Sequence, residues 1–160
     1  MSNVAENDLL TEEGGGTDTT KNMYLAFVIE NEQFAVDVGH IKEIIGVVPI
    51  TLIPKTEDYI KGIINLRGDI VPVIDVRVRF RKPEISYNQL TCIVVVLYQD
   101  YILGLIVDSI LGVYIIEEDM ISSPPNAKLS YSNQFVKNIG RADDGIKLLL
   151  DLEKLIFDLQ

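Results

Sequence analysis

Short apolar runs separated by turn residues place the strongest constraint on the fold of this chain. Runs such as Tyr24 to Ile29 and Thr91 to Leu97 are rich in β-branched and aromatic residues, which favour strands over helices. None approaches the ~20 residues that cross a bilayer as a helix. Many short strands with frequent turns indicate small barrels or sandwiches, so the sequence predicts an all-β fold.

The pattern of apolar residues and turn signals predicts ten strands and a few helical turns. Asp75 is expected to cap a short helix reaching Phe80, and Asp151 a final helix from Leu152 to about Leu159. Further helical turns are predicted for 39–45, 55–61 and 108–111. The predicted strands are 24–29, 33–38, 47–53, 62–66, 70–74, 91–97, 101–107, 113–116, 135–139 and 146–150.

The order of elements recurs in the two halves of the chain. A strand, a turn, an apolar strand, an aspartate and a short helix follow Asn65, and the same series follows Asn138. A half of about 65 residues buries too little surface to be stable alone. We therefore expect two small five-stranded barrels around a shared core, the first at about 24–80 and the second at about 90–151. A disordered tail (1–22) precedes them and a C-terminal helix (152–160) follows.

Charge and cysteine content restrict the classes of function. The net charge of −10 disfavours nucleic acid and anionic membrane surfaces as partners. Cys92 is the single cysteine, so no disulfide forms within the chain, which fits a reducing compartment. With no signal-peptide pattern at the N-terminus, the expected location is cytoplasmic.

Residue types that carry catalysis do not form a recognisable constellation. His40 is the only histidine and lies on an expected surface turn without evident triad partners. Cys92 has no second thiol for a metal site. The strand-ending aspartates read best as helix caps. We expect no enzyme activity, no metal and no cofactor. Two alternatives stay open, a nucleic-acid-binding barrel and a small-molecule site between the barrels. The four aspartates concerned are Asp37, Asp75, Asp108 and Asp151.

The turn Arg67-Gly68-Asp69 separates two of the predicted strands. Gly68 can supply the positive φ that a tight hairpin requires. Arg67 is either a solvated charge beside the turn or an interface anchor, since arginine is enriched at binding hot spots.

The segment Gly62 to Asp75, with its Asn-Leu-Arg-Gly core followed by Ile-Val-Pro-Val-Ile-Asp, closely resembles the CheW family. Supporting matches lie at 34–37, 41–44, 104–108 and 148–152, and the resemblance covers about 24–156. It implies two SH3-like barrels and an adaptor without activity of its own, a CheW-like domain at 23–151.

The resemblance also implies partners and binding residues. It implies binding to the regulatory domain of the histidine kinase CheA and to the cytoplasmic tip of a chemoreceptor, in receptor arrays beneath the inner membrane. A paralogue that serves another signalling pathway has the same pattern. Glu43 and Arg67 are expected to form an exposed ion pair. The implied partner-binding residues are Ile41, Glu43, Asn65, Arg67 and Gly68.

Overall fold

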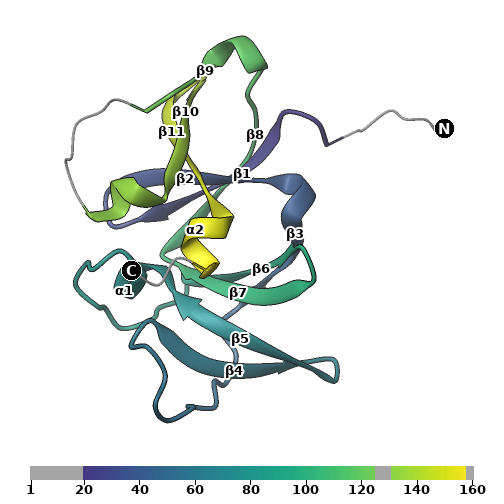
Figure 1. Ribbon diagram of the computed structural model, residues 1–160, viewed down its shortest axis with the longest axis vertical. Coiled ribbons are helices and arrows are strands. Elements are labelled where there is room, and N and C mark those ends of the chain that lie inside the picture. Colours follow the sequence, from purple (N-terminus) through teal and green to yellow (C-terminus); the bar gives the residue numbers. More distant parts are fainter. Residues whose placement is uncertain (1–19, 125–130, 158–160) are drawn as a thin grey trace, which may run out of the picture.

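The computed structural model describes residues 20–124 and 131–157, and these fold into two β-sheets with short helices (Figure 1). The predicted tail falls almost wholly outside this range, as does the end of the predicted last helix. The strands are β1 (Met23–Ile29), β2 (Glu32–Asp37), β3 (Ile41–Gly46), β4 (Ile60–Leu66), β5 (Asp69–Asp75), β6 (Cys92–Tyr98), β7 (Tyr101–Val107), β8 (Ser109–Ile115), β9 (Ile121–Ser122), β10 (Val136–Ala142) and β11 (Gly145–Leu150). The helices are η2 (Val38–His40), α1 (Val76–Arg79), η3 (Glu118–Met120), η4 (Tyr131–Phe135) and α2 (Leu152–Phe157).

Each sheet takes strands from both halves of the chain. The six-stranded sheet has the order β8-β1-β2-β11-β10-β9, and the five-stranded sheet has the order β3-β6-β7-β5-β4. The expected all-β fold with short helices is confirmed, but the predicted division into barrels at 24–80 and 90–151 differs from this arrangement. Periodicity reveals which residues form strands, whereas the pairing of distant strands depends on tertiary packing.

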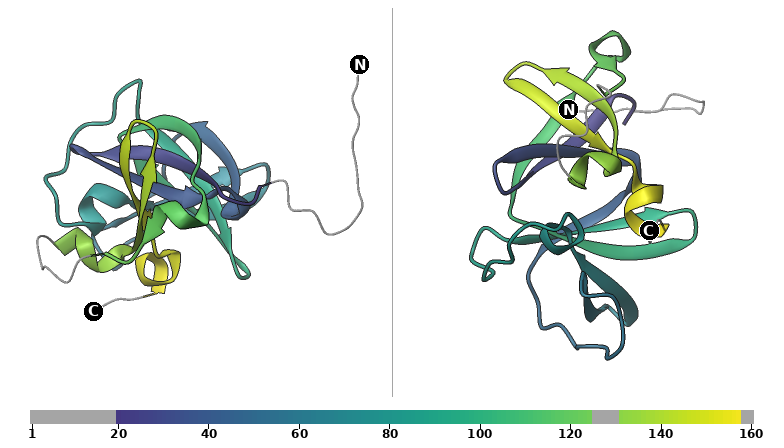
Figure 2. Two further views of the ribbon diagram at one scale, coloured as in Figure 1. Left: turned by 90° about the horizontal axis from the view of Figure 1, so that it is seen from above. Right: turned by 60° about the vertical axis from the view of Figure 1, so that its left-hand side comes forward.

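A shared apolar core holds the two sheets together. Four phenylalanines lie in series through it, with ring centroids 6.5 Å, 5.1 Å and 5.3 Å apart. Phe27 and Phe34 come from the six-stranded sheet, Phe80 follows α1, and Phe135 ends η4. All four are almost fully buried. Helix α2 lies between the sheets in Figure 1 and in the right-hand view of Figure 2.

Charged side chains add cross-links between the sheets. Asp108, after β7, accepts hydrogen bonds from Arg77 Nε at 2.8 and 3.0 Å and from the backbone N–H of Glu30 at 2.7 Å. Arg79 donates to the carbonyls of Leu155 and Lys154 in α2. These contacts fix α1 against the β1–β2 turn and against the C-terminal helix.

Four local predictions are wrong, each where tertiary contacts decide the conformation. The helical turn predicted at 55–61 consists of turns and a bend that lead into β4. The predicted strand 47–53 is irregular and makes only an isolated bridge from Thr51 to Ile63. Proline in this segment removes backbone donors. The helical turns predicted at 39–45 and 108–111 are mainly strands β3 and β8, with only Val38–His40 helical.

The predicted hairpins are confirmed, as are the caps at Asp37, Asp75 and Asp151. The cap predicted at Asp108 is wrong, because strand β8 follows this residue. The Asp75 carboxylate accepts the backbone N–H of Val78 at the start of α1. Asp151 does the same for Lys154 in α2. The β4–β5 and β10–β11 hairpins occur where the sequence placed them.

Candidate partner-binding surfaces and inter-barrel pocket

The β4–β5 hairpin presents an arginine at its tip. Leu66 pairs with Asp69, so Arg67 and Gly68 form a two-residue turn, with φ of 51° and 92°. Positive φ at both central residues is the I′ geometry that continues the twist of the strands. Asn65 Oδ1 accepts the Gly68 N–H at 2.9 Å and closes the turn. The local sequence therefore fixes the direction of the tip.

Arg67 forms an ion pair with Glu43, as the sequence led us to expect. The Arg67 side chain is 69% exposed and that of Glu43 is 24% exposed. Strands β3 and β4 are the two outer strands of the five-stranded sheet, so the ion pair joins its two edges. We call Glu43, Asn65, Arg67 and Gly68 the charged hairpin surface.

Ile41 lies at the opposite end of β3 from Gly46, where it pairs with Val96 and packs partly buried against the shared core. The structure thus brings Asn65, Arg67 and Gly68 together with Glu43. Ile41 lies apart from them and packs partly against the shared core. Ile44, on the same strand, is 42% exposed.

A second surface, which sequence reasoning missed, lies on β8. Val113 pairs with Leu25, and Leu25 pairs with Val36 on β2, so the three side chains share one face of the six-stranded sheet. Leu25 and Val36 are buried in the shared core, whereas Val113 is 53% and Ile115 65% exposed. This face of the six-stranded sheet is therefore buried at β1 and β2 but exposed to solvent at β8. We call Val113 and Ile115 the apolar margin. In the sequence, the alternation of Val113 and Ile115 with Gly112 and Tyr114 was the signal that could have placed these two side chains on one face of a strand.

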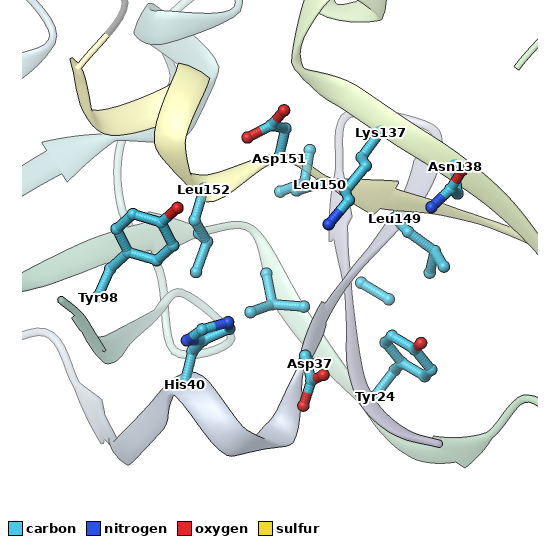
Figure 3. Close-up of a pocket in the computed structure, with 12 residues that line it drawn as sticks. Tyr24, Asp37, His40, Tyr98, Lys137, Asn138, Leu149, Leu150, Asp151 and Leu152 are labelled. Atoms are coloured by element: carbon cyan, nitrogen blue, oxygen red, sulfur yellow. The ribbon is translucent and has the colours of Figure 1, made fainter. Parts of the chain in front are cut away.

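A pocket of about 150 Å³ opens between the two barrels (Figure 3). It lies where β2 and β11, parallel neighbours in the sheet, end and lead into η2 and α2. Apolar side chains from both strands line it, as does Tyr98 from the five-stranded sheet. Its polar lining includes Tyr24, Asp37, His40, Lys137, Asn138 and Asp151.

The acidic groups of this pocket take part in capping. Asp37 Oδ1 accepts the Gly39 N–H at 2.8 Å and Asp151 Oδ1 accepts the Lys154 N–H at 3.2 Å. The pKa of Tyr24 is raised by burial and then by the negative charge of Asp37. The pKa of Tyr98 is raised chiefly by its hydrogen bond to Glu153.

Among residues 20–124 and 131–157, no group of three or more His, Cys, Asp or Glu could hold a metal ion.

In the described ranges, no helix is long and apolar enough to cross a membrane. The two interleaved barrels define a double-barrel protein that exposes the charged hairpin surface and the apolar margin.

Comparison with known proteins identifies the family. The model of the CheW-like domain matches residues 23–160, and the chain belongs to the CheW family. It is 32% identical over 139 residues to the chemotaxis protein CheW of Klebsiella aerogenes, covering 87% of this chain and 84% of that protein. The Bacillus subtilis chemotaxis protein CheW is 29% identical over 137 residues, covering 86% and 88%.

A solved structure agrees with the fold. The scaffolding protein TtCheW from Thermoanaerobacter tengcongensis superimposes with a TM-score of 0.79 at 33% identity, covering 85% of this chain and 92% of that chain. The predicted pair of small SH3-like barrels is thereby confirmed.

Proposed function

We propose that this protein is a non-enzymatic adaptor that couples chemoreceptors to the histidine kinase CheA. The observation that carries the proposal is the presence of two different exposed surfaces on one interlocked body. The charged hairpin surface belongs to the five-stranded sheet and the apolar margin to the six-stranded sheet. Two sites on one rigid molecule are what bridging requires, and membership of the CheW family supports this role.

The charged hairpin surface suits the regulatory domain of the kinase. Arg67 is a non-glycine residue in the left-handed region at φ 51°, a conformation that costs about 1 kcal/mol or more. Glycine or asparagine would form this turn with less strain. An arginine retained there at the tip is available as an anchor, since its side chain is mostly exposed.

The apolar margin suits the helical tip of a receptor. A helix binds to another protein by laying apolar side chains into an apolar groove. Val113 and Ile115 continue the apolar face of the six-stranded sheet to a place where it is exposed. Binding there would hold the adaptor in the cytoplasm beneath the inner membrane, and the repeated contacts of an array would strengthen each weak one through effective concentration.

Co-sedimentation with receptor-containing membranes and the cognate kinase tests the proposal. The wild-type chain should bind both partners and show no ATP hydrolysis of its own. Arg67→Asn should weaken kinase binding alone, and Val113→Ser with Ile115→Ser should weaken receptor binding alone. Leu90→Ser, which changes a leucine that is 63% exposed before β6, is the matched apolar control. Wild-type protein that binds neither partner would exclude the adaptor role.

A further inference from the structure

The inter-barrel pocket is separate from both proposed partner surfaces. Leu149 of β11 lies beside Ala35 of β2 in parallel register, so the carboxyl ends of these strands meet at one edge. The chain then leaves in two directions, through η2 and through α2. A crevice outside the carboxyl ends of parallel strands, where their continuations diverge, is a recurrent ligand position in open sheets. A cavity of about 150 Å³ accommodates a group of the size of benzene.

Tyr24 and Tyr98 lie on opposite sides of this pocket, and Asp37 and Asp151 also belong to its lining (Figure 3). Tyr24 is the direct cross-strand partner of Asp37. On the other side, Tyr98 donates a hydrogen bond to Glu153 at 3.1 Å, and Asp151 adds negative charge near the same phenol. Carboxylates combined with aromatic faces recognise a delocalised cation, because the cation can stack on a ring while its N–H groups contact a carboxylate.

Lys137 currently supplies the positive charge. Its ammonium group points into the pocket in Figure 3, but the side chain belongs to an exposed residue. The salt bridges found in the described part of the chain do not include it. An ammonium on a flexible four-carbon stem can move aside for a competing cation.

We propose that this pocket binds a guanidinium group, presented by an arginine side chain of a protein partner, which displaces the Lys137 ammonium. A planar guanidinium stacks on an aromatic ring better than an ammonium does. The net charge of −10 favours the approach of a basic segment. The site does not depend on the proposed adaptor function, because neither the charged hairpin surface nor the apolar margin lines it.

Nuclear magnetic resonance titration of the full chain with methylguanidinium chloride at constant ionic strength tests the proposal. We expect saturable shifts of the backbone amides at Gly39, His40 and Leu152. Asp37→Asn and Asp151→Asn keep the capping geometry, since asparagine caps helices as well as aspartate does. Each should weaken binding by up to about fivefold. Lys137→Gln should strengthen binding, and Asp119→Asn, an exposed acid in η3, should leave it unchanged.

Two further ligands test the sign of the charge that the pocket prefers and whether the guanidinium belongs to a peptide or to a free amino acid. Acetate should cause no saturable shift. N-acetyl-arginine amide, which resembles an arginine within a peptide, should bind more tightly than free arginine, whose carboxylate meets the acidic lining. No saturable binding of methylguanidinium, or loss of binding in Lys137→Gln, would overturn the proposal. Tighter binding of free arginine would replace the partner side chain by a small molecule.

Discussion

At the scale of single residues, Arg67 combines a strained backbone with an exposed, charged side chain. Its side chain contributes an exposed ion pair with Glu43, which is worth about 0–1 kcal/mol of folding free energy. Its left-handed backbone costs about 1–3 kcal/mol. The ion pair at most offsets this strain, so stability alone does not explain an arginine at this turn.

Substitution of Arg67 should therefore change binding more than folding. Arg67→Asn should leave the free energy of unfolding within about 1 kcal/mol of wild type, because asparagine tolerates positive φ. Binding to the kinase fragment should weaken in the same variant. Arg67→Glu should weaken it further, and adding Glu43→Arg should restore part of the loss. A double-mutant cycle of affinities and chemical denaturation measure these effects. A loss of several kcal/mol in Arg67→Asn would make this arginine structural.

Tyr87 provides a pH-dependent contribution to stability. Its hydroxyl donates to Asp75 Oδ2 at 2.7 Å, and burial, followed by this hydrogen bond, raises the Tyr87 pKa above its ordinary value of 10.0. The folded state therefore holds this proton more tightly than the unfolded state does. The contribution of the protonated Tyr87 hydroxyl to the free energy of unfolding is complete below pH 10, and it is lost as the pH rises toward the folded-state pKa.

Tyr87→Phe should lower the free energy of unfolding by about 1–3 kcal/mol at neutral pH, because the buried Asp75 carboxylate loses a donor. It should also flatten the decline of stability above pH 10. Urea denaturation at pH 7 and across pH 9–11 measures both effects. Tyr101→Phe, at a tyrosine that is 54% exposed, is the control. An alkaline slope identical to wild type would contradict this assignment.

At the scale of elements, sequence reasoning succeeded where the determinants are local. The β4–β5 hairpin follows from Arg67-Gly68 between two apolar runs, and Asp75 caps α1 through its own neighbour Val78. It failed at β3 and β8, whose partners β6 and β1 lie far away in the sequence. The ion pair of Glu43 with Arg67 was predicted from the opposite charges and the resemblance to the CheW family. The apolar margin depends on which part of the six-stranded sheet the rest of the fold leaves exposed.

Gly62 lies at a register shift in β4, where the close approach of another segment leaves no room for a side chain. Its φ is +144°, and a Cβ there would lie 2.1 Å from the carbonyl oxygen of Thr51. Gly62→Ala should therefore destabilise the fold by about 2–5 kcal/mol through backbone strain and overpacking. Gly46→Ala adds a Cβ with nothing within 4 Å and should change stability little. Thermal unfolding of both variants distinguishes them, and equal melting temperatures would contradict the close approach.

At the scale of the whole molecule, the exchange of strands between the sequence halves makes the two barrels one cooperative unit. β1 and β2 pair with β8 and β11, while β6 and β7 lie between β3 and β5 in the five-stranded sheet. The contacts of Asp108 with Arg77 and Glu30, and of Arg79 with α2, add to the shared core. A partner held at the charged hairpin surface is therefore connected to the apolar margin through packed structure, without a flexible linker.

A break in the connection between α1 and β6 tests this cooperativity. Residues 83–89 form no helix or strand, so a cut between Glu84 and Ile85 removes no backbone pairing within an element. The N-terminal fragment keeps β1–β5 but lacks β6 and β7, which lie between β3 and β5 in the sheet. Because each fragment exposes core residues and buries too little surface, each should be unfolded or aggregated when expressed alone. The two fragments expressed together should associate and recover the circular dichroism spectrum of the intact chain. A cooperative thermal transition in either isolated fragment would show that half of the sequence suffices for a stable barrel, and it would contradict the single unit inferred here.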